Sequence, residues 1–167
     1  MSYVIVQLAL SLDGYIARKN GDVDFLGDMN TEFTEEFNSF VHSIDTIIMG
    51  RGTYEKMLEF GEMPFKNKKI YVLTKQKLKS NEPHVTFTKT NISSLCQEID
   101  GNIWLFGGSK VIKSFINLGL VDEFQLLYVP QIIGEGIPMF LNSSGMKDLT
   151  LVKHEHYGDS LFVVYKK

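Results

Sequence analysis

The sequence predicts an α/β fold: a three-layer sandwich in which helices cover both faces of a mostly parallel central sheet, with an antiparallel C-terminal hairpin. Apolar, β-branched segments typical of strands alternate with segments whose apolar residues recur at helical spacing. The last two expected strands are separated only by Tyr157-Gly158-Asp159, which suits a hairpin turn. No internal repeat or linker interrupts the 167 residues, so we expect a single domain over 1–167.

The expected strands are apolar segments bounded by turn residues. The first covers 3–10 and is followed by Asp13-Gly14. The second, 45–49, is a continuous apolar run that ends at Gly50, as expected of a strand buried on both faces. The remaining expected strands are 69–74, 85–88, 102–106, 123–129, 149–155 and 160–165.

Four helices are expected between these strands. In the first, Phe33, Phe37 and Phe40 share one face, and either Asn30 or Thr31 is in place to cap it. This aromatic stripe is typical of a core, although part of it would also suit the wall of a flat substrate pocket. The other helices are indicated by Tyr54, Met57 and Leu58; by Ile92, Leu95 and Ile99, with Asn91 as the cap; and by Val111, Ile112, Phe115 and Ile116, ending near Gly119.

Composition excludes several classes of function. Seventeen Lys and Arg against twenty Asp and Glu give a net charge of -3, which argues against nucleic acid as a partner. No apolar run is long enough to span a membrane and no signal peptide is evident, so we expect a soluble, cytoplasmic protein. Cys96 is the single cysteine and is expected to be a buried structural thiol. His154 and His156 lack a third ligand, so no metal site is expected.

Two junctions between a strand and a helix are the strongest candidates for a binding site. At the first, the buried strand ends in Gly50-Arg51-Gly52 and Thr53 opens a helix. Free backbone N–H groups and the positive end of a helix suit an anion there. The alternative is a tight turn in which Thr53 is a plain N-cap. The spacing is not that of the G-x-G-x-x-G motif, because Glu55 stands where the third glycine belongs.

The second junction repeats this pattern with Gly107-Gly108, Ser109 and Lys110. A further strand ends in Thr74-Lys75. Because the carboxyl ends of parallel strands meet at one edge of a sheet, these segments are expected to share a crevice. A ligand with several phosphates would use more than one of them.

Short motifs in a fixed order give the chain a family resemblance. They lie at 11–17 (Ser-Leu-Asp-Gly-Tyr-Ile-Ala), 49–55 (Met-Gly-Arg-Gly-Thr-Tyr-Glu), 73–74, 106–111, 121–123, 130 and 134–140. In their order and spacing, the chain resembles the dihydrofolate reductase superfamily, in particular the branch with the reductase domain of the bacterial riboflavin-biosynthesis deaminase-reductase. The resemblance implies a dihydrofolate reductase-like fold that binds NADPH.

The resemblance also implies which residues hold the cofactor. The pyrophosphate and the extra phosphate on the adenosine ribose would be held by Gly50, Arg51, Gly52 and Thr53. The adenosine end would be flanked by Leu73, Thr74 and Lys75, with Lys75 or Arg51 as the partner of the extra phosphate. The diphosphate and the nicotinamide ribose would be wrapped by Gly107, Gly108, Ser109, Lys110 and Val111, and the ring would lie against Ala9 and Ile16. The family commonly joins the paired glycines by a cis peptide, so we expect one between Gly107 and Gly108.

The implied reaction is hydride transfer to a pyrimidine- or pterin-like ring, or to its ribosyl unit, as in 5-amino-6-(5-phosphoribosylamino)uracil reductase. The alternatives are dihydrofolate reductase proper, whose Leu-Pro-Trp stretch is missing from 21–28, and a nucleotide-binding module without turnover. Candidate proton donors are Asp13, an acid of the first helix (Glu32, Glu35 or Glu36) and an ordered water. Relatives in the riboflavin pathway suggest a homodimer, formed through the C-terminal strands.

The substrate itself is left open. The riboflavin-pathway domain tends to carry arginines for its substrate phosphate just before the second strand. In this chain, His42 is the only polar side chain in that stretch that can become cationic. The deaminase half of the bifunctional relatives, with its zinc-binding His and Cys residues, has no counterpart in these 167 residues.

Overall fold

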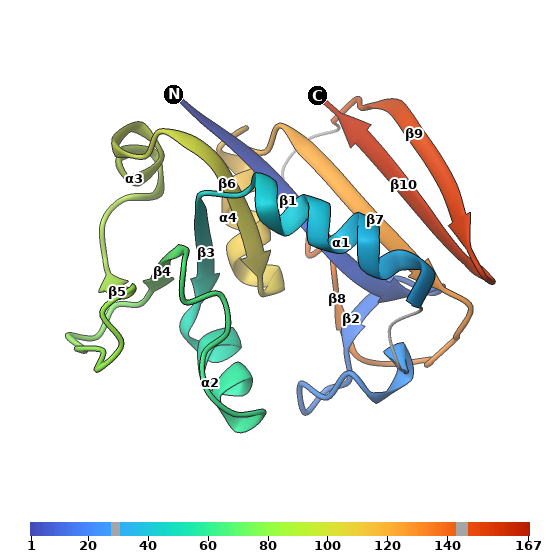
Figure 1. The fold of residues 1–167 in the computed structure, drawn as a ribbon, viewed down its shortest axis with the longest axis horizontal. Helices are drawn as coiled ribbons and strands as arrows, with labels where there is room; N and C mark the ends of the chain where they lie inside the picture. The colour runs from blue at the N-terminus through green and yellow to red at the C-terminus, as the bar shows by residue number, and fades with distance from the viewer. Residues whose placement is uncertain (28–30, 143–146) are drawn as a thin grey trace.

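The computed structural model describes residues 1–27, 31–142 and 147–167, and it contains the expected alternation of strands and helices (Figure 1). The strands are β1 (Ser2–Ser11), β2 (Tyr15–Ala17), β3 (Thr46–Gly50), β4 (Lys69–Leu73), β5 (Val85–Thr88), β6 (Gly101–Gly107), β7 (Glu123–Val129), β8 (Ile137–Pro138), β9 (Thr150–Tyr157) and β10 (Ser160–Lys166). The helices are α1 (Thr31–Ser43), α2 (Arg51–Glu59), α3 (Ile92–Glu98) and α4 (Ser109–Asn117), with a 3-10 turn η1 (Asp24–Leu26).

Eight strands form the central sheet in the order β5-β4-β3-β6-β1-β7-β10-β9. The central strand β1 pairs in parallel with both β6 and β7, so that Ile5 stands opposite Trp104 on one side and Glu123 on the other. Strand β10 runs antiparallel to β7 and to β9. The predicted parallel sheet with an antiparallel C-terminal hairpin is therefore confirmed.

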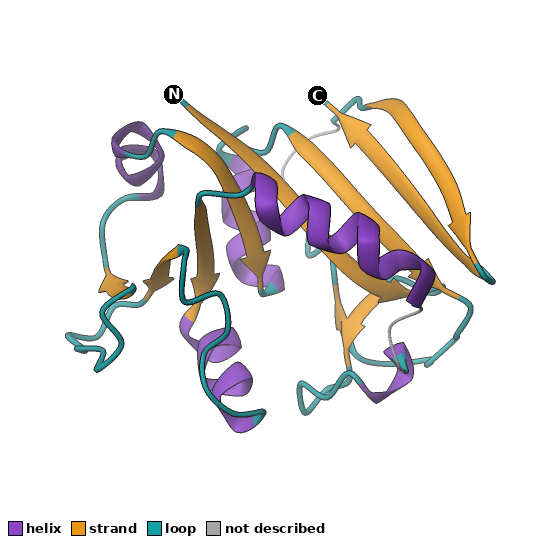
Figure 2. Cartoon of the chain, in the orientation of Figure 1, coloured by secondary structure: helices purple, strands orange, loops and turns teal. Residues whose placement is uncertain are grey.

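Helices cover both faces of this sheet (Figure 2). Alternate residues of β1 divide between two apolar clusters, with Val4 and Val6 on one side and Ile5 on the other. The first cluster is closed by apolar side chains of α3 and α4, and the second by those of α1 and α2. The three-layer prediction is confirmed, and the aromatic stripe of α1 packs into the core, where Phe33 is only 2% exposed.

The helix starts differ in part from the sequence analysis. Asn91 caps α3 as expected, because its side-chain oxygen accepts hydrogen bonds from the N–H groups of Ser93 (2.9 Å) and Ser94 (3.4 Å). Thr53 is not the N-cap of α2: the helix begins at Arg51, and Gly50 holds the cap position without a side-chain hydrogen bond. Asn30, one of the two expected caps of α1, lies outside the described residues.

Two further expectations concern the burial of Cys96 and the lack of a helix that could span a membrane. Cys96 is buried, and burial raises the pKa of its thiol to about 11, which confirms the expected structural thiol. Among the described residues, no helix combines the length and apolar character needed to cross a bilayer.

A second, two-stranded sheet was not expected from the sequence. Strand β2 pairs antiparallel with β8, so that Tyr15 faces Pro138 and Ala17 faces Ile137. The backbones approach closely here: a Cβ added to Gly136 would lie 2.4 Å from the carbonyl oxygen of Ala17. This small sheet lies at the edge where the parallel strands end (Figure 1).

Candidate functional site

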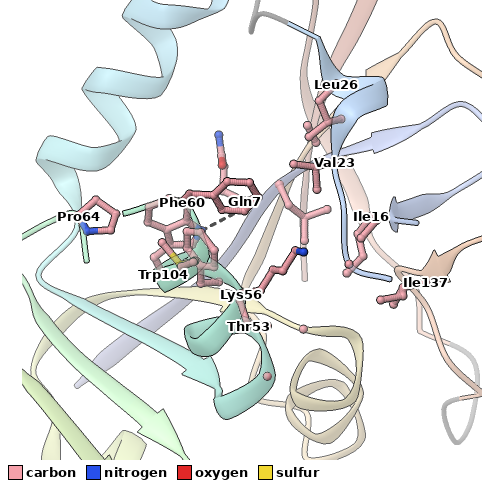
Figure 3. Close-up of a pocket in the computed structure, with 18 of the residues that line it drawn as sticks. Gln7, Ile16, Val23, Leu26, Thr53, Lys56, Phe60, Pro64, Trp104 and Ile137 are labelled. Carbon is pink, nitrogen blue, oxygen red and sulfur yellow. Dashed lines mark hydrogen bonds between the residues drawn. The ribbon is translucent and has the colours of Figure 1, made fainter. Parts of the chain in front are cut away.

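A cavity of about 510 Å³ opens at the carboxyl ends of the strands, between β1, α1, α2 and the small sheet (Figure 3). Its walls are largely apolar: Leu8, Ala9, Ile16, Ala17, Val23, Leu26, Phe33, Phe37, Met57, Phe60, Pro64, Phe65, Trp104, Phe106 and Ile137. Its polar lining side chains, among the described residues, are Gln7, Thr53 and Lys56. Cavities of this size and character are typical of sites for small organic ligands.

Trp104 lies at the centre of the aromatic wall. Its ring contacts those of Phe37, Phe65 and Phe106 at centroid distances of 5.8, 5.4 and 4.7 Å. Its indole N–H donates a 3.0 Å hydrogen bond to the backbone carbonyl of Gln7 on the neighbouring strand. The wall is therefore preformed by packing within the sheet and α1, and it offers flat aromatic faces to a ligand.

The two glycine junctions face each other beside this cavity. A Cβ at Gly50 would lie 3.0 Å from Cγ2 of Val111, and a Cβ at Gly108 would lie 3.3 Å from Oγ1 of Thr53. The peptide between Gly107 and Gly108 is cis, as expected from the resemblance. The two glycine junctions thus adjoin as expected from the sequence, because each contacts the helix that follows the other. Thr74 and Lys75, expected in the same crevice, do not line this cavity.

A second hollow of about 300 Å³ lies at the ends of β4 and β5 and against α4. It is lined by Leu73, Thr74, Thr88, Thr90, Ile92, Val111 and Ser114, and by three lysines, Lys75, Lys89 and Lys110. None of these lysines forms an ion pair with the described residues. Three uncompensated cations beside the N-terminus of α4 suit a polyanion.

The expected cofactor residues divide between these two hollows. Five line the larger cavity: Ala9, Ile16, Gly52, Thr53 and Gly108. Five line the lysine-bearing hollow: Leu73, Thr74, Lys75, Lys110 and Val111. Gly50 and Gly107 lie at the contact between the junctions, and the Ser109 hydroxyl donates to the carbonyl of Pro138. Arg51 lines neither hollow and pairs with Glu55 at 3.3 Å.

The candidate acids of α1 lie outside the larger cavity. The Glu32 carboxylate accepts a 3.0 Å hydrogen bond from the N–H of Gly158. Glu36 pairs with Lys153 at 2.9 Å and accepts a 3.2 Å hydrogen bond from the Tyr157 hydroxyl. Both carboxylates thus join α1 to the β9–β10 hairpin, and neither is among the lining residues described for the cavity.

Asp13, the remaining candidate acid, is also not among the residues that line the larger cavity. Its carboxylate accepts hydrogen bonds from the N–H groups of Gly134 (2.8 Å) and Ile133 (3.3 Å), which fixes the loop before β8. The hydroxyl of Ser11 and these N–H groups lower the pKa of Asp13 below its ordinary value of 3.8. Asp13 is therefore a carboxylate at neutral pH, which suits a structural role.

We expect Asp13→Asn to lower the urea midpoint at neutral pH, because the uncharged amide accepts these hydrogen bonds less strongly. A lowered folded-state pKa contributes stability above the unfolded pKa, and this contribution is lost as the pH falls through the folded value. The difference in midpoint should therefore persist from neutral pH to mild acid and close in stronger acid. Urea unfolding at several pH values measures it, with the exposed Asp159→Asn as control. A difference that grows in acid would contradict this assignment.

The polar lining residues missed by the sequence analysis include Gln7, Lys56 and Lys89. Gln7 lies on the cavity face of β1, where the apolar pattern of the strand hides it. Lys56 follows the Gly50–Thr53 junction by one turn of α2 and pairs with Asp22 across the cavity mouth. Lys89 directly follows β5, and this position at the carboxyl end of a strand could have identified it as a site residue from the sequence.

Comparison with known proteins gives the family. A family model described as the RibD C-terminal domain matches residues 2–163. The chain belongs to the RibD C-terminal domain family. It is 31% identical over 166 residues to the uncharacterized protein YwjB of Bacillus subtilis, with 96% of this chain and 95% of YwjB covered. It is 34% identical over 179 residues to the uncharacterized protein YyaP of the same organism, with 97% and 93% covered.

Solved structures share the fold. A putative riboflavin biosynthesis protein from Shewanella has a TM-score of 0.85 and 24% identity, with 98% of each chain covered. A Thermotoga maritima protein, a diaminohydroxyphosphoribosylaminopyrimidine deaminase and 5-amino-6-(5-phosphoribosylamino)uracil reductase, has a TM-score of 0.74 and 21% identity. The match covers 99% of this chain and 56% of the Thermotoga chain. This RibD C-terminal domain therefore has the fold of a riboflavin-pathway reductase.

Proposed function

We propose that this RibD C-terminal domain is an NADPH-dependent reductase that transfers hydride to a pyrimidine- or pterin-like ring. One observation carries the proposal: the two glycine junctions lie together between an apolar cavity and a hollow bearing three lysines. A nicotinamide dinucleotide has this distribution of chemistry, with a flat ring at one end and phosphates at the middle and the adenosine end.

The residues at hand fit that cofactor. The absence of side chains at Gly50, Gly52 and Gly108 lets a diphosphate approach the backbone N–H groups at the starts of α2 and α4. Ala9 and Ile16 would contact the nicotinamide ring within the larger cavity. The lysine-bearing hollow would take the adenosine end, where the geometry favours Lys75 over Arg51 for the extra phosphate, and Lys89 joins it as a second cation.

When bound, NADPH would supply the hydride, and the acceptor would also take up one proton. This chain's own residues would do the rest. The aromatic wall around Trp104 aligns a flat acceptor and keeps water away. The junction glycines determine how closely the cofactor diphosphate approaches the backbone. A C=N or C=O bond of the acceptor is reduced, so no protein nucleophile is required.

Lys75→Ala should raise the dissociation constant for NADPH about tenfold, because a phosphate would lose a charge-assisted partner. NADH, which lacks that phosphate, should bind the variant nearly as well as the wild type. Arg51→Ala serves as the matched cation control and should change the two affinities by similar factors. The measurement is a titration of both cofactors into both variants. A selective loss of NADPH binding in Arg51→Ala alone would return the phosphate to Arg51.

Turnover tests the proposal itself. NADPH oxidation should be accelerated by at least one acceptor in a panel of pyrimidines, pterins and small carbonyl compounds. Activity confined to dihydrofolate would instead favour dihydrofolate reductase proper. Tight NADPH binding without any oxidation across the panel would favour the nucleotide-binding module.

A further inference from the structure

We infer that the larger cavity takes a flat, uncharged ring with a lactam-type edge and no phosphate group, held by the side-chain amide of Gln7. The inference rests on the proposed function, because it names the substrate class of the same site. It follows from the Gln7 amide, which has no partner among the described residues, from the charges at the cavity mouth, and from the aromatic lining.

The side-chain amide of Gln7 has no hydrogen-bond partner among the described residues. Gln7 is 5% exposed and lines the cavity on the same face of β1 as Ala9. Its backbone carbonyl accepts the Trp104 N–H, but its side-chain amide makes no hydrogen bond with the described residues. Among the described residues, the fully enclosed side-chain nitrogen or oxygen without a hydrogen-bond partner is Nε2 of His84, so the Gln7 amide keeps a small accessible area. A ligand in the cavity would take the place of water at this amide and supply its hydrogen bonds.

The chemistry of an amide indicates what would pair with it. A glutamine side chain offers one carbonyl acceptor and an NH₂ donor side by side. A ring with an adjacent C=O and N–H, as in a lactam, matches both with two hydrogen bonds. Such a site discriminates strongly against rings that lack this edge, because a bound ring without it would cover the amide and leave it unpaired.

The charges at the cavity argue against a phosphate. Lys56 is the single cationic side chain among the described lining residues. Its ammonium group lies 2.8 Å from a carboxylate oxygen of Asp22 and 2.8 Å from one of Glu59. Figure 3 shows Lys56 reaching across the space between α2 and the segment that carries Val23. Two carboxylates against one ammonium leave this mouth net negative, so an entering phosphate would lose its hydration without gaining a free cation.

The rest of the lining suits a flat ring. Aromatic side chains line the cavity from both α1 and the sheet, including Phe33, Phe37, Trp104 and Phe106. Planar heterocycles stack on such faces, whereas a ribosyl phosphate gains little there. The three uncompensated lysines lie in the other hollow, where the adenosine end of the cofactor is proposed.

Lumichrome tests this inference, because it is a flat, uncharged tricyclic ring with such an edge. Quenching of Trp104 emission measures its binding to the protein with and without NADP⁺. We expect saturable binding, weakened at least about tenfold by Gln7→Leu. The melting temperature of Gln7→Leu should not fall, because no protein hydrogen bond is lost. Asn102→Leu, which removes a 2.8 Å hydrogen bond to the carbonyl of Ser43 at the amino end of β6, should lower the melting temperature and leave lumichrome binding unchanged.

Riboflavin and riboflavin 5′-phosphate form a matched pair that differs by the phosphate alone. We expect riboflavin to bind at least about tenfold more tightly. No lumichrome binding, equal binding by wild type and Gln7→Leu, or a preference for the phosphorylated flavin would each overturn the inference. NADPH titration separates this inference from the proposed function. If the wild type does not bind NADPH, the reductase proposal is contradicted. If the wild type binds NADPH but not lumichrome, only the substrate class is contradicted.

Discussion

Gly136→Ala should destabilise the fold by about 3 kcal/mol, because a new methyl group cannot be accommodated where β8 passes β2. The added Cβ would lie 2.4 Å from the Ala17 carbonyl oxygen, 3.2 Å from Cδ1 of Ile133 and 3.3 Å from Cβ of Tyr15. Backbone rather than a flexible side chain limits the space, so β8 must move. Ala17 and Ile137 line the larger cavity, and ligand binding there should weaken as well.

Gly134→Ala is the matched control for this substitution. Gly134 lies in the same turn with a φ of 77° and nothing within 4 Å of an added Cβ. Its replacement should cost only the backbone strain of a left-handed alanine, about 1 kcal/mol. Urea unfolding of both variants measures the difference. A loss in Gly136→Ala no larger than that in Gly134→Ala would show that the close approach of the two strands does not limit the fold.

Gly52→Leu should raise the dissociation constant for NADPH at least about 100-fold, equivalent to about 2.7 kcal/mol. Gly52 lies in the first turn of α2 and lines the larger cavity, and an added Cβ meets nothing within 4 Å. A leucine there would fill the space proposed for the cofactor. Its stability should equal or exceed that of the wild type, because leucine favours a helix more than glycine does.

Two further variants complete this test. Gly52→Ala should give an intermediate loss of NADPH affinity, since a methyl group fills less of the space. Glu98→Leu, on an exposed position of α3 away from both hollows, should leave the affinity unchanged. An affinity of Gly52→Leu close to that of the wild type would place the cofactor elsewhere.

Local signals in the sequence predicted the central sheet, its helices and the glycine junctions. Strand and helix periodicity is a property of neighbouring residues, and the parallel order then brings the strand ends together at one edge. The contact between the Gly50 and Gly108 junctions could therefore be predicted from the sequence. The start of α2 could not: the helix begins at Arg51, two residues before the predicted Thr53.

Contacts between distant segments could not be predicted in this way. Strands β2 and β8 are short and pair across more than a hundred residues, so neither shows a strand pattern of its own. Glu36 was a reasonable candidate acid until the fold placed it against Lys153 and Tyr157 of the hairpin. Gln7 lies within an apolar strand, and only its buried position beside the cavity distinguishes it. The expected homodimer and the proton donor stay predictions.

Energy transfer from Trp104 to NADPH tests the central claim most directly. Trp104 is the only tryptophan and lines the cavity in which the nicotinamide ring is proposed to lie. Titration with NADPH should quench its emission saturably at micromolar concentrations, in the range usual for KM values, with a matching rise in dihydronicotinamide emission. Gly52→Leu should abolish both changes over the same range. An emission that falls only as much as that of free tryptophan in the same NADPH solutions would contradict the account.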